Sequence, residues 1–399
     1  MTDTKTLIEW ADKHLMYTAK RAPVALVRGE GVRVWDSDGK EYLDFTGGIA
    51  VTALGHSHPK VVGTMREQAA TLLHVSNLFY IPQQTQLAKL LCDHSFADRV
   101  FFSNSGAEAN ETAIKLARKW AKEHGASDRG DIITMRGGFH GRTLATVTAT
   151  AQEKYHHGYE PLPGGFKYVP YNDLRAVERA LDSRTAAIMV EPIQGEGGVI
   201  IPDDGYLPGL RKLCDEAGVL LILDEIQTGM GRTGKLWAYE HAGVSPDIMT
   251  VAKALANGIP IGAALATEDV ATAFSPGTHG STFGGNPFAT AVGLTVLTAM
   301  LEERLPERAA KMGKLMLERL EALRGRHAGK IKAVRGKGCL VGVDLVPPVA
   351  DVVNACRERG LLVLTAGDNT LRLAPALILS EGDVSRAVEA IEGAVAAAK

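Results

Sequence analysis

Short runs that are apolar at every position, separated by helical patterns, are the feature that most constrains the fold of this chain. The runs AAIMVEP (186–192) and VLLILDE (219–225) show no alternation of apolar and polar residues, so both faces of each strand should be buried. Between them, GYLPGLRKLCDEAG has apolar residues at helical spacing. This alternation predicts an α/β fold in which helices cover both faces of a mostly parallel sheet.

Other segments extend this pattern and indicate how the chain is divided. More strands are expected at RVFFS (99–103), DIITM (131–135), LATVTAT (144–150), DIMTVA (247–252) and GAALAT (262–267). On either side the pattern changes, to a hairpin with its turn at Asp38–Gly39 and to a charged helical stretch broken near Pro306. We therefore expect a large domain over residues 58–300 and a smaller domain formed by residues 1–57 and 301–399.

Composition argues against several classes of protein. The chain has 399 residues and a net charge of −2, which gives no reason to expect nucleic acid as a partner. It has no apolar run of the roughly 18–20 residues that a membrane-spanning helix needs, and its acidic N-terminus is unlike a targeting peptide. Its four cysteines form no CxxC pair, so we expect free thiols, no metal site and a cytoplasmic location.

Three features in the middle of the chain carry candidate chemistry. SNSGAEAN (103–110) leads a strand into a helix, and the free N–H groups of that helix start could bind a phosphate. Asp224 ends an apolar strand, and Lys253 lies within a long apolar stretch that would lower its pKa. Each has an ordinary alternative: a helix capped by Asn104 or Ser105, an ion-paired acid, and a lysine that extends into water.

Taken together, these features are the groups that a pyridoxal phosphate site needs. A lysine bonds the cofactor, an acid holds a proton on its ring nitrogen, and a helix start takes its phosphate. We therefore expect the segments around Asp224 and Lys253 to meet the helix start in one site.

Nine stretches of the sequence, in order, match the motifs of one enzyme family. They are GGIAVTALGHSHP, HVSNLFY, FFSNSGAEANE, GGFHGRTLA, EPIQGEGGV, LDEIQTGMGRTG, AKALANGIPIGA, HGSTFGGNP and LTAGDNTLRLAP. On these motifs the chain resembles the class III (ω-amino) aminotransferases over residues 20–380. The resemblance implies the fold type I of pyridoxal phosphate enzymes, which is aspartate aminotransferase-like: a large domain with a mostly parallel seven-stranded sheet and a smaller α+β domain. It also implies a homodimer with active sites at the subunit interface.

The resemblance implies which residues bind the cofactor phosphate. Ser105, Gly106 and Ala107 would bind it, largely through backbone N–H groups. Thr282 would reach the phosphate of the neighbouring subunit. Phe283, next to it, is expected to be buried in a rigid wall of the site.

The resemblance also implies the residues around the cofactor ring. Phe139 would stack on the ring, and Asp224 would stabilise its protonated nitrogen. Gln227 would bond the phenolic oxygen. Lys253 would be both the Schiff-base lysine and the base that moves the proton during transfer.

Substrate recognition is implied to depend on two arginines. Arg142 would bind the α-carboxylate of acetylornithine and the distal carboxylate of 2-oxoglutarate, and Arg372 would bind the α-carboxylate of glutamate or 2-oxoglutarate. Glu196 would pair with Arg372 and withdraw when the keto acid arrives. Ser281 is also expected to contact substrate. The family's tyrosine before APVALVRGEG is not at its usual place, and the nearest is Tyr17.

The expected reaction is a two-step transfer of the terminal amino group of N2-acetylornithine to 2-oxoglutarate, in arginine biosynthesis. The alternatives within the class are ornithine, succinylornithine, 4-aminobutyrate and N-succinyl-diaminopimelate as donors. A dehydrogenase is disfavoured because SNSGAEAN contains no GxGxxG. A binding protein without activity on the same fold is the remaining alternative.

Overall fold

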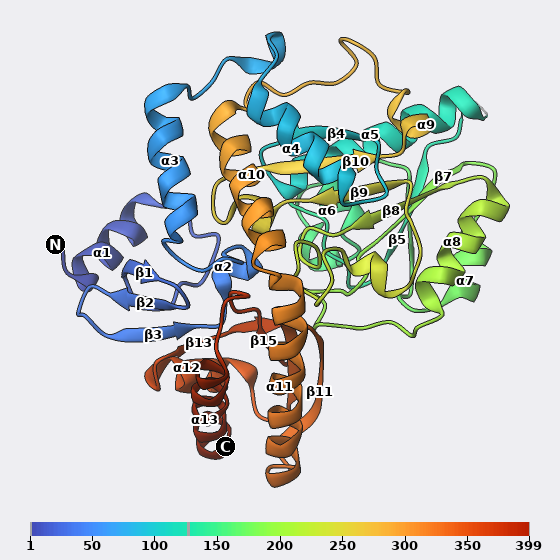
Figure 1. The fold of residues 1–399 in the computed structure, drawn as a ribbon. Coiled ribbons are helices and arrows are strands. Elements are labelled where there is room, and N and C mark those ends of the chain that lie inside the picture. Colours follow the sequence, from blue (N-terminus) through green and yellow to red (C-terminus); the bar gives the residue numbers. More distant parts are fainter. Residues whose placement is uncertain (1, 126–127, 399) are drawn as a thin grey trace.

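A seven-stranded sheet forms the centre of the computed structural model, which describes residues 2–125 and 128–398 (Figure 1). Its strands, in spatial order, are β4 (Arg99–Ser103), β10 (Gly262–Ala266), β9 (Ile248–Val251), β8 (Leu220–Asp224), β7 (Thr185–Val190), β5 (Asp131–Met135) and β6 (Phe166–Val169). Within this sheet β10 runs antiparallel to both of its neighbours, and the other neighbouring pairs are parallel. The prediction of a mostly parallel, seven-stranded sheet is confirmed.

Successive residues of the central strands enter two different hydrophobic cores. In β8, Leu220 and Ile222 pack on the face covered by α5 (Gly106–His124). Leu221 and Leu223 belong to the core on the opposite face. That face is covered by two helices, α7 (Leu174–Ala180) and α8 (Tyr206–Ala217). The apolar runs are unbroken because no position of these strands faces water.

The prediction of a strand over residues 144–150 is wrong, because Leu144–Ala149 form the helix α6. Its β-branched residues are typical of strands. However, the hydroxyl groups of Thr148 and Thr150 donate to carbonyl oxygens four residues earlier, which satisfies them within a helix. The strand at this edge of the sheet is instead β6, which the sequence pattern did not predict.

The two ends of the chain contribute two further four-stranded sheets. One contains β1 (Leu26–Glu30), β2 (Arg33–Asp36), β3 (Glu41–Asp44) and β13 (Leu361–Leu362); the other contains β11 (Ile331–Lys337), β12 (Leu340–Leu345), β15 (Thr370–Leu373) and β14 (Leu364–Ala366). In the first sheet β13 pairs in parallel with β3, with Leu361 opposite Leu43. A strand from the N-terminal part of the chain therefore lies beside one from the C-terminal part (Figure 1). The division into domains at residues 58 and 300 stays a prediction.

The predicted hairpin turn at Asp38–Gly39 is confirmed between β2 and β3. Asp36 stabilises it, because its Oδ1 accepts hydrogen bonds from the backbone N–H groups of Asp38 and Lys40. Gly39 has φ +83°, a left-handed conformation that glycine adopts without strain.

The remaining long helices lie on the outside of the sheets (Figure 1). They are α1 (Thr4–His14), α3 (Pro59–Thr71), α4 (Pro82–Asp93), α10 (Pro287–Glu302), α11 (Leu305–Arg326), α12 (Val349–Glu358) and α13 (Glu381–Ala397). Shorter helices are α2 (Gly47–Ala50) and α9 (Glu268–Ala271). The predicted break lies between α10 and α11, where Arg304 has φ +51° and Pro306 falls in the first turn of α11. Among the described residues, no helix has the length and apolarity to span a membrane.

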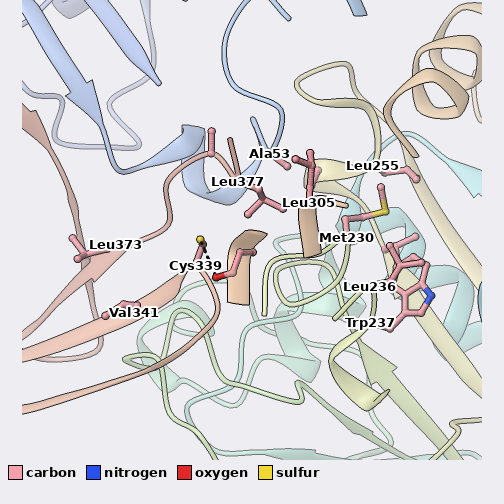
Figure 2. Close-up of a cluster of buried hydrophobic side chains, with 14 of the residues drawn as sticks. Ala53, Met230, Leu236, Trp237, Leu255, Leu305, Cys339, Val341, Leu373 and Leu377 are labelled. Atoms are coloured by element: carbon pink, nitrogen blue, oxygen red, sulfur yellow. Dashed lines mark hydrogen bonds between the residues drawn. The ribbon is translucent and has the colours of Figure 1, made fainter. Parts of the chain in front are cut away.

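Buried side chains from the middle of the chain and from both of its ends meet in one core (Figure 2). Trp237 and Met230, from the loop after β8, lie in this core with Ala53 and Leu377. The loop that follows Asp224 is therefore anchored by apolar packing. Cys339 also belongs to this core, and none of the four cysteines forms a disulfide, which confirms the expected free thiols.

Candidate active site

A cavity of about 420 Å³ lies where the parallel strands of the central sheet end. β8 ends at Asp224, Glu191 directly follows β7, and Lys253 lies two residues after β9. The predicted site residues that line this cavity are Ser105, Gly106, Ala107, Phe139, Arg142, Asp224, Gln227 and Lys253. The carboxyl edge of an open α/β sheet is the expected place for a ligand in this fold class.

The start of α5 forms one end of the cavity. Ser105 is the N-cap, and its Oγ accepts a hydrogen bond from Glu108 N at 3.1 Å. Asn104, the other predicted cap, instead donates to Glu108 Oε2 through its backbone and its side chain. The N–H groups of Gly106 and Ala107 have no acceptor inside the helix and lie at its positive end, which suits a phosphate. A Cβ on Gly106 would come within 2.8 Å of Ile226 Cδ1, so a larger residue here would require the Ile226 side chain to move.

Asp224 is held by a buried network at the end of β8. Its Oδ2 accepts from Asn110 Nδ2 and lies beside His140 Nδ1, each at 2.8 Å. Thr250 Oγ1 donates to Asn110 Oδ1, which orients the amide. The other oxygen of Asp224 accepts the N–H of Ile226 at 3.1 Å, so it keeps capacity for one more donor, such as a protonated ring nitrogen.

Sequence reasoning did not predict Asn110 and His140 as site residues. Asn110 lies in FFSNSGAEANE and His140 in GGFHGRTLA. Asn110 is a polar residue among apolar ones on the buried face of α5, and this polarity is the signal that could have identified it. Burial alone would lower the pKa of His140, but the hydrogen bond and charge of Asp224 outweigh this and raise it. A protonated His140 would place a positive charge beside the Asp224 carboxylate.

Lys253 begins the short helix η4 (Lys253–Ala256) with φ +38°, a strained conformation for a residue other than glycine. Burial lowers the pKa of Lys253 from 10.5 to about 8, the charge of Glu196 opposes this shift, and Arg372 adds to it. Roughly a tenth of the amine is then neutral at pH 7, far more than for a free lysine. The prediction that the apolar stretch lowers this pKa is confirmed.

Arg372 lies on β15, is buried, and is paired with an acid. Its Nη1 donates to Glu196 Oε1 at 2.5 Å and to Gln227 Oε1 at 3.1 Å. Gln227 Nε2 donates to the same oxygen of Glu196 at 3.4 Å. Burial raises the pKa of Glu196, but the charge of Arg372 outweighs it and the net pKa is lowered. A Cβ on Gly195 would come within 2.3 Å of Gln227 Oε1, so the amide needs glycine beside it.

Arg142 lies at the cavity in a different environment. Its side chain is exposed, and it forms no ion pair or hydrogen bond with a side chain in the described part of the chain. Its guanidinium carbon lies over the ring of Tyr155, 3.9 Å from the centroid, and 5.5 Å from that of Phe139. Phe139 is fixed through its backbone N–H, which donates to Glu191 Oε2 at 3.0 Å.

Four further predicted residues are absent from the cavity wall, as are Arg372 and Glu196, which are connected to it through Gln227. Ser281 Oγ accepts from Asn104 Nδ2 at 3.2 Å and so lies near the rim, whereas Thr282 is exposed. Phe283 is 61% exposed, so the prediction that it is buried is wrong for the part of the chain that the structure describes, where its ring packs on His74. Tyr17 is 77% exposed.

The residues at this cavity fit pyridoxal phosphate. A helix start without acceptors lies at one end, and a buried carboxylate with a free lone pair lies at the end of β8. A lysine that is easily deprotonated and an aromatic side chain complete the set.

Comparison with known proteins agrees with this geometry. The family model of the class-III aminotransferases matches residues 16–395. The chain therefore belongs to this family and is a pyridoxal phosphate-dependent aminotransferase of fold type I.

Individual relatives cover nearly the whole chain. The acetylornithine aminotransferase of Myxococcus xanthus is 52% identical over 95% of this chain and 95% of its own, and that of Caldanaerobacter subterraneus subsp. tengcongensis is 50% identical over 97% and 98%. Among solved structures, the ornithine aminotransferase of Toxoplasma gondii has a TM-score of 0.96 at 35% identity and covers 100% of this chain and 96% of its own. The acetylornithine aminotransferase of Elizabethkingia anophelis has a TM-score of 0.89 at 38% identity, over 99% and 100%.

Proposed function

We propose that this enzyme transfers the terminal amino group of N2-acetylornithine to 2-oxoglutarate, which yields N-acetylglutamate 5-semialdehyde and glutamate. The observation that carries the proposal is that Arg372, which reaches the cavity through Gln227, is paired with Glu196, whereas Arg142 on the cavity wall has no acidic partner among the described residues. Two substrates whose carboxylates lie in different places can then use one site in turn. Relatives named acetylornithine aminotransferase support the same donor, and the reaction would belong to arginine biosynthesis.

The cofactor would be bound by residues from three segments. Ser105, Gly106 and Ala107 would bind its phosphate through backbone N–H groups. Asp224 would keep a proton on its ring nitrogen, and Phe139 would stack on its ring. When bound, pyridoxal phosphate supplies a conjugated ring that withdraws electrons and carries the amino group between the two substrates.

Two further residues would act around that ring. Lys253, whose pKa is about 8, would accept and return the proton at the carbon that carries the amino group. Gln227 would donate to the phenolic oxygen with the N–H that its contact with Glu196 leaves free.

The arginines would act in different steps. The carbon of N2-acetylornithine that carries the terminal amine bears no carboxylate, so Glu196 stays on Arg372 while the distant α-carboxylate binds Arg142. 2-Oxoglutarate brings a carboxylate to each arginine and displaces Glu196. This exchange is feasible because one buried ion pair replaces another. Ser281 would contact the substrate from the rim.

We also propose that the enzyme is a homodimer with its active sites at the subunit interface. Leu78, Phe79 and Tyr80 are 81, 68 and 99% exposed, and large exposed apolar side chains in one area mark an interaction surface. Asn77 connects this segment to the rim of the cavity, because its Nδ2 donates to Ser281 O at 3.2 Å. Thr282 would then reach the phosphate in the partner subunit. A cytoplasmic location is proposed because free thiols suit a reducing compartment.

Ornithine is the second candidate donor. The high TM-score with the ornithine aminotransferase of Toxoplasma gondii favours it, and ornithine has an α-carboxylate that Arg142 could bind. Succinylornithine, N-succinyl-diaminopimelate and 4-aminobutyrate are the other amino donors to be compared.

The decisive experiment is to measure glutamate formation from 2-oxoglutarate with each of these amino donors. We expect the highest kcat/KM with N2-acetylornithine, and no turnover of any donor by the control variant Lys253→Ala. A higher kcat/KM with ornithine or 4-aminobutyrate would assign the enzyme to that donor instead.

A further inference from the structure

Tyr155 is in contact with two of the cavity residues, although it does not line the cavity itself. It ends the short helix η2 (Glu153–Tyr155), and the guanidinium carbon of Arg142 lies 3.9 Å from its ring centre. The ring of Phe139 meets it edge-on, with 6.1 Å between centroids and 84° between planes. One aromatic side chain thus contacts both the exposed cation and the aromatic wall of the site.

Arg142 depends on its aromatic contacts, of which that with Tyr155 is closer than that with Phe139, because its side chain has no hydrogen bond or ion pair among the described residues. Its guanidinium has five N–H donors, and none bonds to another group in the described part of the chain. A long side chain without partners must be ordered when a ligand binds, and this ordering weakens binding. A guanidinium that lies over an aromatic ring is restrained, while the donors at its edge stay available to a carboxylate.

We propose that Tyr155 is a positioning residue that orients Arg142 for the substrate carboxylate far from the reacting carbon. The proposal rests on the proposed function, in which Arg142 binds the α-carboxylate of N2-acetylornithine. Lys154 Nζ also lies over the same ring, 4.9 Å from its centroid, so the ring gathers two cations. Their combined charge attracts a carboxylate to this side of the cavity.

The contacts of Tyr155 provide a matched pair of variants. Its hydroxyl group forms no hydrogen bond with any residue that the structure describes, so Tyr155→Phe keeps every contact that the proposal needs. Tyr155→Leu keeps apolar bulk but removes the ring. Because Tyr155 is only partly buried, both variants should fold, and Tyr155→Met is a second variant without a ring.

Binding can be measured without turnover. N-acetyl-L-norvaline has the acetyl group and α-carboxylate of N2-acetylornithine but no terminal amine, so it cannot react. In calorimetry with the holoenzyme, we expect Tyr155→Leu and Tyr155→Met to weaken its binding about five- to tenfold, and Tyr155→Phe to stay within about twofold of the wild type. Unchanged affinity in both variants without a ring, or an equal loss in Tyr155→Phe, would overturn the proposal.

Turnover separates positioning from a general structural effect. N-acetylputrescine is N2-acetylornithine without the carboxylate, so it does not need Arg142. In Tyr155→Leu we expect the KM for N2-acetylornithine to rise with little change in kcat, and kcat/KM for N-acetylputrescine to stay within about twofold. Equal losses for both amines would contradict the proposal. Failure of the proposed function would differ, because the wild type itself would then show no preference for N2-acetylornithine over N-acetylputrescine.

Discussion

Two arginines near one cavity are in opposite environments: Arg142 lines it, and Arg372 lies behind the lining residue Gln227. Arg372 is 2% exposed and bonds both Glu196 and Gln227, whereas Arg142 is exposed and rests on an aromatic ring. Both present the same guanidinium group, so the difference lies in what surrounds it. A buried arginine without an acid is unfavourable, and an exposed arginine needs no counter-charge.

The difference matches what each arginine would have to do in the proposed two-step reaction. A carboxylate would reach Arg142 in both steps, so a permanent acidic partner there would compete with every substrate. A carboxylate would reach Arg372 in one step only, and in the other step Glu196 would take its place. One site can therefore accept two substrates without a change in its cofactor-binding residues.

Arg372→Ala should have the largest effect and should affect the two steps unequally. It removes the partner for the α-carboxylate of 2-oxoglutarate and leaves the partly buried Glu196 without its counter-charge. We expect the 2-oxoglutarate step to slow by roughly 100- to 1000-fold and the acetylornithine step by much less. Single-turnover rates of each half-reaction measure this, and equal losses in both would contradict the assigned roles.

Arg142→Ala should have a smaller effect that is similar in both steps. Loss of a charged hydrogen-bonding partner for a carboxylate corresponds to about 1.5–3 kcal/mol, or roughly 10- to 100-fold in kcat/KM for either substrate. Arg142→Lys is the control, and it should recover part of the loss because it keeps the charge but not the paired donors. If only one substrate were affected, the two arginines would not differ as proposed.

Glu196→Ala should leave Arg372 without its carboxylate partner in both steps. Glutamate would then compete with N2-acetylornithine in the first step, and we expect its relative kcat/KM to rise about tenfold, the effect of one charged hydrogen bond. Glu196→Gln keeps the size of the side chain but not its charge and should behave similarly. An unchanged substrate preference in both variants would contradict the proposal that a substrate carboxylate displaces Glu196 from Arg372.

The sequence predicted most of the central sheet because unbroken apolar runs have one explanation, burial on both faces. It did not predict α6, where threonine hydroxyl groups bond within the helix, or β6, which is four residues long and only partly buried. Both failures concern short segments, in which few residues are available to show a period.

The cavity was predictable for a similar reason. Asp224 and Lys253 follow neighbouring parallel strands, whose carboxyl ends must lie at one edge of the sheet. The contact between Asn110 and Asp224 joins residues 114 positions apart, and no local pattern predicts it. Phe283 was expected to be buried, but it is 61% exposed, and the residue type alone does not determine its burial.

The smallest predicted effect is a shift in the pKa of Lys253, which should differ between substitutions of the two arginines. Burial lowers this pKa to about 8, Arg372 contributes to the lowering, and Arg142 is not among the main charged groups that shift it. Only the neutral amine can bond the cofactor, so its capture by the apoenzyme should speed up as pH rises through about 8 and level off above that. Arg372→Ala removes a nearby positive charge, which makes the ammonium form more stable and moves the midpoint to higher pH.

Glu196→Ala should move the same midpoint to lower pH, because the carboxylate stabilises the ammonium form. Arg142→Ala is the matched control and should leave the midpoint where it is. The measurement is the rate of pyridoxal phosphate capture, followed by absorbance over a range of pH. A shift in Arg142→Ala as large as that in Arg372→Ala would mean that both arginines act on Lys253. The proposed difference between a paired Arg372 and an exposed Arg142 would then be contradicted.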